Sequence, residues 1–217
     1  IKEQQGREYF NYFEQGVIYR VKGLPPKLME GDSFFNNPFR MGGVYVLEIL
    51  EKGVQNEFLQ GLIDKYTKPV SISSKVFGKM TLDKQLGWYE GKADWLGERI
   101  SFYISCEEKS EAKKTLKKLE EMYSSAQKWD KEFRECAAKE LVEDANDWLM
   151  DSVEDDEEQP TEITRSDFAR RIKIESIELD DEGEFTVFFG DDDMFWGHSV
   201  VVYGSLENGA EEAQMEG

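Results

Sequence analysis

The residues best suited to chemistry lie close together near the end of the chain. Residues 190–203 read Gly-Asp-Asp-Asp-Met-Phe-Trp-Gly-His-Ser-Val-Val-Val-Tyr and contain the single histidine of the protein. Carboxylate oxygens are the ligands that Ca²⁺ and Mg²⁺ prefer, and a histidine can act as a general base. The candidate site residues, for binding in the first instance, are Asp191, Asp192, Asp193, Trp196 and His198.

The spacing within this stretch argues against catalysis. The three aspartates lack the alternating ligands and distal Glu of a calcium loop, which favours a plain acidic hairpin turn. If a strand follows the turn, Ser199 points to the face opposite His198, so the two cannot form a nucleophile and base. We expect His198 to be hydrogen-bonded within the sheet, with a binding role as the alternative. Gly197 indicates a bulge or a close backbone approach.

Motifs of the common enzyme classes are missing from the sequence. It contains no Walker-type loop, no dinucleotide-binding glycine pattern and no nucleophile elbow. One histidine and the distant Cys106 and Cys136 make a poor zinc ligand set, and we expect both thiols to be reduced. We therefore predict no catalytic residue, no metal and no cofactor.

The charge of the chain separates the classes of partner. With 46 acidic and 27 basic residues, the formal net charge is −19. Such a surface repels nucleic-acid phosphates and anionic lipid headgroups, so we expect neither partner, whereas a basic protein fits. The alternative is that acidity only keeps the protein soluble. With no apolar run of about 18 residues and no start typical of a signal peptide, we expect a cytoplasmic protein.

The candidate stretch needs a scaffold, and the hydrophobic pattern predicts an antiparallel sheet over residues 172–216. Its first segment, residues 172–179, alternates with an irregularity at Glu175-Ser176 that indicates a β-bulge. Two further strands, after turns at 180–183 and 190–193, are predicted at 185–189 and 195–204. Together they form a three-stranded meander. A second meander is predicted over residues 86–105.

Helical periodicity governs the stretch before this sheet. Over residues 110–148 apolar side chains recur every three or four positions. One helix of that length is too long for the domain, so we expect a break near Ser124-Ser125 and a helical hairpin packed on the sheet. A coiled-coil surface is the alternative. Thr164 resembles an N-cap and predicts a short helix through Arg171. We expect the five tryptophans to anchor the core, whereas several exposed together would mark an interface.

Two regions are harder to interpret. Residues 1–75 give a poorly predicted N-terminal α/β region, with an amphipathic helix over 54–66 and either a strand or a helix start at 44–50. Residues 151–158 form an acidic run that we expect to be a solvated linker, with a cation site as the alternative. We therefore predict two parts, residues 1–75 of unclear fold and an α+β domain over residues 76–217.

Several motifs of the second part carry a resemblance to a known family. They are Ile174-Glu175-Ser176-Ile177, the turn at 181–183, Asp-Met-Phe-Trp-Gly-His-Ser-Val at 193–200 and the segment 204–209, with Trp95, Gly97 and Trp129-Asp130 further back. From about Thr81 to its end, the chain resembles the bacterial domain of unknown function family 2262. The resemblance implies bacterial origin and a mixed α+β domain, and it brings no activity, cofactor or catalytic residue.

Two functional hypotheses follow. The first is a non-enzymatic, acidic protein-binding module, in its most specific form an immunity-type partner of a basic toxin, by analogy with small modules whose strands carry Trp, Gly and His. The second is a metal-dependent hydrolase that uses Asp191, Asp193 and His198. An enzyme needs these side chains to converge in a concave pocket, whereas a binder needs an exposed patch of one charge. The oligomeric state stays open.

Overall fold

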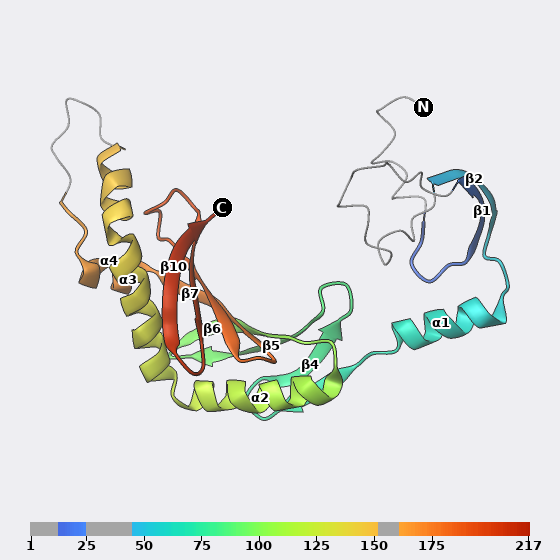
Figure 1. Ribbon diagram of the computed structural model, residues 1–217, viewed down its shortest axis with the longest axis horizontal. Coiled ribbons are helices and arrows are strands. Elements are labelled where there is room, and N and C mark those ends of the chain that lie inside the picture. The colour runs from blue at the N-terminus through green and yellow to red at the C-terminus, as the bar shows by residue number, and fades with distance from the viewer. Residues whose placement is uncertain (1–12, 25–44, 152–160) are drawn as a thin grey trace. The chain divides into compact units, whose positions relative to one another are not determined.

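The computed structural model describes residues 13–24, 45–151 and 161–217 (Figure 1). The chain divides into two compact units, residues 1–68 and residues 69–217. The division falls a few residues before the boundary expected after residue 75, because the strand β3 (Ser71–Ser74) pairs with β4 (Gly78–Asp83) of the second unit. The predicted acidic linker at 151–158 lies, beyond its first residue, outside the described residues.

The first unit contains a β-hairpin and a helix. Strands β1 (Tyr19–Leu24) and β2 (Tyr45–Lys52) pair in antiparallel fashion. The segment 44–50, for which the sequence allowed either a strand or the start of a helix, therefore belongs to a strand. The helix α1 (Glu57–Thr67) matches the amphipathic helix predicted over 54–66. Asn56 caps its N-terminus, because the side-chain oxygen accepts a hydrogen bond of 2.9 Å from the amide of Leu59.

The second unit contains one eight-stranded sheet in the order β10-β9-β8-β7-β6-β5-β4-β3. Neighbouring strands are antiparallel except β6 and β7, which are parallel. The two predicted meanders therefore join edge to edge, and the C-terminal one has four strands because the chain reverses once more after β9. The further strands are β5 (Trp88–Trp95), β6 (Glu98–Ser105), β7 (Lys173–Asp180), β8 (Glu184–Gly190), β9 (Ser199–Ser205) and β10 (Gly209–Glu216).

Three helices occupy the connection between the parallel strands β6 and β7. They are α2 (Lys109–Ser124), α3 (Ala126–Asp151) and α4 (Arg165–Arg171). The predicted break is confirmed at Ser125. Thr164 caps the N-terminus of α4, because its hydroxyl accepts a 3.1 Å hydrogen bond from the amide of Asp167. The predicted bulge in β7 is also confirmed, because the pairing with β8 shifts between Ile174 and Ser176.

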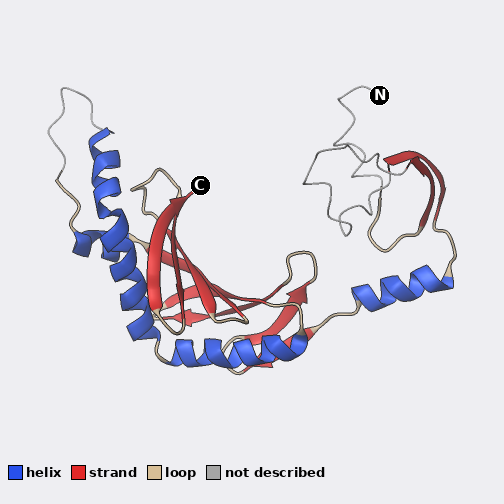
Figure 2. Ribbon diagram, viewed as in Figure 1, coloured by secondary structure: helices blue, strands red, loops and turns tan. Residues whose placement is uncertain are grey.

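The helices pack on the sheet as expected, but α2 and α3 meet at a bend instead of folding back as a hairpin (Figure 2). The reason is the twist of the sheet. The strand direction turns steadily across the eight strands, so two straight helices follow different parts of the same face. Accordingly, α2 contacts β3, β6 and β7, whereas α3 contacts β9 and β10.

The hydrophobic core lies between the helices and the face of the sheet on which α2 and α3 pack. Alternation along β6 buries Ile100, Phe102 and Ile104 and places Tyr103 on the other face. Rings from both helices and from several strands meet there, for example Trp95 and Phe133, whose centroids are 6.4 Å apart. Alternate side chains of β5 to β9 project from the opposite face. None of the described helices is long and apolar enough to cross a membrane.

Candidate functional site

The candidate stretch forms a loop between β8 and β9. We predicted that a strand begins at Phe195, and this is wrong, because β9 begins only at Ser199. The cause is the buried side chain of Asp191, which accepts hydrogen bonds from the amides of Asp193 (3.3 Å), Phe195 (2.7 Å) and Gly197 (3.0 Å). Amides that donate to this carboxylate cannot join the ladder with β8. Trp196 and His198 therefore lie on a loop organised by one aspartate.

The backbone of the loop is unusual in its dihedral angles. Asp192, Asp193 and Trp196 have φ angles of 52°, 60° and 55°, in the left-handed region. Side chains other than those of Gly, Asn and Asp rarely adopt this conformation, which costs a tryptophan about 1–2 kcal/mol. Gly197 has a φ of 91° and open space where a Cβ would lie, so this glycine serves the turn and not a close backbone approach. The expected bulge or close contact is wrong at this position.

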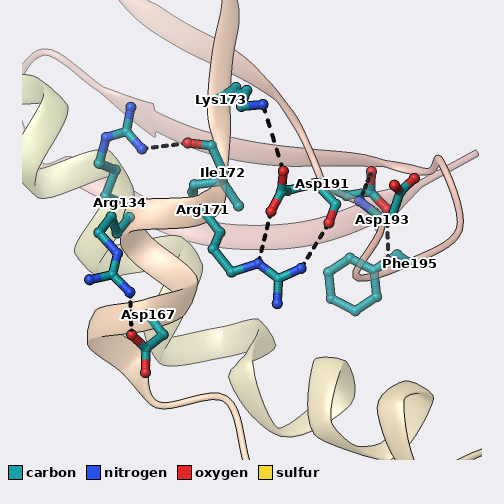
Figure 3. A network of polar contacts seen from close by, with 10 residues as sticks. Arg134, Asp167, Arg171, Ile172, Lys173, Asp191, Asp193 and Phe195 are labelled. Carbon is teal, nitrogen blue, oxygen red and sulfur yellow. Dashed lines mark hydrogen bonds and ion pairs between the residues drawn. The ribbon is translucent and has the colours of Figure 1, made fainter.

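The three adjacent aspartates have three different environments. The carboxylate of Asp192 accepts a 2.9 Å hydrogen bond from Nε of Arg171 and lies 3.6 Å from Nζ of Lys173. Figure 3 shows the side chains of Arg171 and Lys173 pointing toward this acidic stretch. The hydrogen bond from Arg171 holds the pKa of Asp192 below its usual value. Asp193 is exposed at the surface, whereas Asp191 is buried. The three carboxylates therefore do not converge on one point.

The geometry also bears on the hydrolase hypothesis. Both carboxylate oxygens of Asp191 are engaged by backbone amides, and Nδ1 of His198 lies 2.6 Å from the carbonyl oxygen of Phe195. We had expected His198 to be hydrogen-bonded within the sheet, and this is wrong. The histidine is held within the loop instead. In the described ranges no three side chains of His, Cys, Asp or Glu are placed to hold a metal ion.

An aromatic cluster forms where the loop meets the end of α3. The ring of Trp148 on α3 contacts Trp196 at a centroid distance of 4.8 Å, His198 at 5.5 Å and Phe195 at 5.7 Å. Phe195 is buried and also packs on Phe168 of α4. Trp196 is 65% exposed, so its expected role as a core anchor is wrong, although Trp95 and Trp129 fit that role. We call Trp148, Trp196 and His198 the aromatic platform.

Trp148 is a site residue that the sequence pattern did not indicate. The apolar stripe of α3 runs through Leu141 and Ala145, and Trp148 continues it by three further residues toward the C-terminal end of the helix. That position signals a residue at the limit of the core, but only the structure brings it against the loop. A small pocket of about 60 Å³ lies beside the platform, with Arg171 and Asp193 among its lining residues.

The platform has an acidic border. Residues 140–151 at the end of α3 carry five carboxylates and no lysine or arginine: Glu140, Glu143, Asp144, Asp147 and Asp151. All five are exposed. The C-terminal end of a helix has a partial negative charge that disfavours further anions, and this effect is confined to the last turn. The charge of Asp151, the last residue of α3, is therefore not explained by the needs of the helix.

A polar network fixes α3 and α4 beneath the loop. Asp130 accepts hydrogen bonds from Nε1 of Trp95 (3.0 Å) and from Nε of Arg134 (2.8 Å). The guanidinium of Arg134 also donates to the carbonyl oxygens of Ala169 and Ile172, at 2.9 and 2.6 Å, at the C-terminal end of α4. This network sets the position of Arg171 next to the loop. Asp130 and Arg134 are four residues apart, a spacing typical of ion pairs along a helix. This spacing is the signal by which the pair could have been found in the sequence.

The two cysteines play no part in the site. Cys106 follows β6 and is buried, Cys136 lies on α3 and is partly buried, and both are free thiols. Burial raises the pKa of each thiol, which makes the reactive thiolate rarer.

Fold and site together define an α+β domain with one broad, mostly antiparallel sheet, on which the helices α2 and α3 pack, and with a tryptophan displayed by a surface loop. Residues 74–215 match the model of a family described as an uncharacterized protein conserved in bacteria, the domain of unknown function 2262. The chain belongs to this family, which confirms the resemblance seen in its sequence. No curated protein and no solved structure matches the chain.

Proposed function

We propose that this protein is a non-enzymatic, acidic protein-binding module that engages a basic protein through the aromatic platform and its acidic border. The observation that carries the proposal is Trp196, which is 65% exposed although it is the largest kind of apolar side chain. Asp191 and the left-handed backbone hold it in that position at a cost in free energy. Tryptophan is among the residues that contribute most to binding at protein interfaces.

The charges around the platform favour a basic partner. The carboxylate of Asp151 lies in the last turn of α3, where the helix dipole disfavours it, and a cationic partner would relieve this repulsion. The net charge of −19 would also speed the encounter with such a partner and make the association depend on salt. The specific form of the proposal is an immunity-type protein whose acidic surface covers a basic surface of a toxin.

Retention of partners on the immobilised protein tests this proposal. An extract of the native bacterium is passed over wild-type protein and over Trp196→Ala at low and at high salt. We expect a basic protein on the wild type at low salt, its release at high salt, and at least about tenfold less retention on Trp196→Ala. Asp147→Asn combined with Asp151→Asn is expected to weaken retention and its salt dependence.

Matched controls separate this site from general stickiness. Phe58→Ala removes an aromatic side chain that is 73% exposed in the first unit, and it is expected to leave retention unchanged. Glu98→Gln removes an exposed carboxylate at the start of β6 and should likewise have no effect. Equal losses with Phe58→Ala and Trp196→Ala, or retention that salt does not change, would contradict the proposal.

A further inference from the structure

A second pocket lies on the face of the sheet that the helices leave uncovered. It has a volume of about 380 Å³ and lies where strands β4, β5 and β6 are adjacent. Its lining residues are Thr81, Leu82, Asp83, Leu86, Trp88, Glu90 and Tyr103. The pocket belongs to the second unit and is formed by other residues than the aromatic platform.

Aromatic rings form one side of the pocket. Trp88 on β5 and Tyr103 on β6 have ring centroids 5.0 Å apart with planes inclined at 46°. Neither side chain belongs to the hydrophobic core, and each is only partly buried. Leu86, which is 59% exposed, lies at the turn between β4 and β5 and adds an apolar rim. Such π-faces attract cations and pack well against aliphatic stems.

Two carboxylates complete the lining, and no lysine or arginine belongs to it. Oδ1 of Asp83 accepts hydrogen bonds from the amides of Gln85 and Leu86, at 2.8 and 3.1 Å. Glu90 is contacted by the hydroxyl of Ser101 at 3.4 Å and by Nζ of Lys92 at 3.6 Å, both on Oε1.

From this combination we infer that the pocket between β4 and β6 binds the guanidinium group of an arginine side chain from a protein partner. A planar guanidinium can stack on an aromatic ring and donate paired hydrogen bonds to a carboxylate, and a compact ammonium cannot do both. The charge of the lining and the net charge of −19 are complementary to such a partner. This inference goes beyond the proposed function, because it concerns a different surface and does not require that the aromatic platform binds.

The test uses a single-residue probe, so that multivalent attraction to an acidic protein does not obscure the result. N-acetyl-arginine amide is titrated into the full chain while the indole NH signals are followed by NMR. We expect the Trp88 signal to shift in a saturable manner. N-acetyl-lysine amide should bind more weakly, and the neutral isostere N-acetyl-citrulline amide should produce no saturable shift.

Variants keep the assignment falsifiable. Trp88→Leu is expected to weaken the binding about two- to fivefold, and Glu90→Gln by a similar factor, as judged from the remaining amide shifts of the pocket. Glu98→Gln, which removes the same charge outside the pocket, and Trp196→Ala should leave the binding unchanged. Citrulline acting like arginine, an unaffected Glu90→Gln variant, or shifts at Trp148 and Trp196 instead of Trp88 would each overturn the inference. Because Trp196→Ala is measured separately in the retention experiment, failure of the arginine pocket can be distinguished from failure of the aromatic platform to bind a protein.

Discussion

At the scale of single residues, neighbouring side chains of one type have unlike roles. Asp191 is buried and accepts hydrogen bonds from three backbone amides. Asp192 forms ion pairs with Arg171 and Lys173, and Asp193 is exposed. A buried carboxylate that accepts hydrogen bonds from several amides stabilises a loop more than an exposed ion pair does. The reason is that buried amides without a hydrogen-bond partner would raise the free energy of the folded state. The loop therefore depends mainly on the first of the three aspartates.

This ranking leads to a prediction about charge-neutralising variants. Asp191→Asn replaces one acceptor oxygen by a donor facing the amides of Phe195 and Gly197, so we expect the free energy of unfolding to fall by about 1–3 kcal/mol. Urea denaturation measures this change, and hydrogen exchange should show faster exchange at these two amides.

Asp193→Asn is the matched control. It removes the same charge from an exposed position, and asparagine tolerates the left-handed backbone of this residue, so the change should stay within about 0.5 kcal/mol. Equal effects of the two substitutions would show that Asp191 does not organise the loop.

At the scale of elements, the Asp130 and Arg134 pair connects the helices to the sheet. Arg134 joins α3 to the carbonyl oxygens at the end of α4, and Asp130 joins α3 to Trp95 at the end of β5. The side chains of Arg134 and Asp130 are only 21% and 15% exposed. Because α4 leads directly into β7 and carries Arg171, this network positions both the strand and the loop.

We expect Arg134→Met to be strongly destabilising. The substitution leaves the carboxylate of Asp130 without its cation and two carbonyl oxygens without donors, which should lower the free energy of unfolding by about 3 kcal/mol. Arg170→Met is the control, because its ion pair with Asp167 is exposed at the arginine and should contribute less than about 1 kcal/mol. Chemical denaturation of both variants measures the difference, and a small loss for Arg134→Met would contradict this role.

At the scale of the whole molecule, the hydrophobic core identifies the folding unit. Among the residues that the structure describes, the buried core cluster extends from Ile72 to Ala213 and lies within residues 69–217. The strand β3 contributes Ile72, which is 2% exposed. An independent unit must therefore include β3, although the family match begins at residue 74.

Two fragments test this boundary. We expect residues 69–217 to fold alone with the cooperative urea transition of the second unit in the full chain. Residues 76–217 lack β3 and the side chain of Ile72, so their free energy of unfolding should be lower by about 2–4 kcal/mol. Equal stability of the two fragments would show that β3 is not part of the unit.

Several features follow from local rules and could be predicted from the sequence. The break at Ser125, the cap at Thr164, the helix after Asn56 and the bulge near Ser176 each depend on residues only a few positions apart. The α+β class follows in the same way, since the hydrophobic period changes from helical to alternating along the chain. The motifs around Trp196 were also enough to identify the family.

How these elements meet depends on contacts between residues far apart in the chain. The parallel pairing of Phe102 with Ile177 joins strands separated by three helices, and the contact of Trp148 with Trp196 brings together a helix end and a loop. Local patterns show which side of an element is buried but not what covers it. The loop was mistaken for a strand for the same reason, because one buried carboxylate, at Asp191, diverted its amides from the sheet.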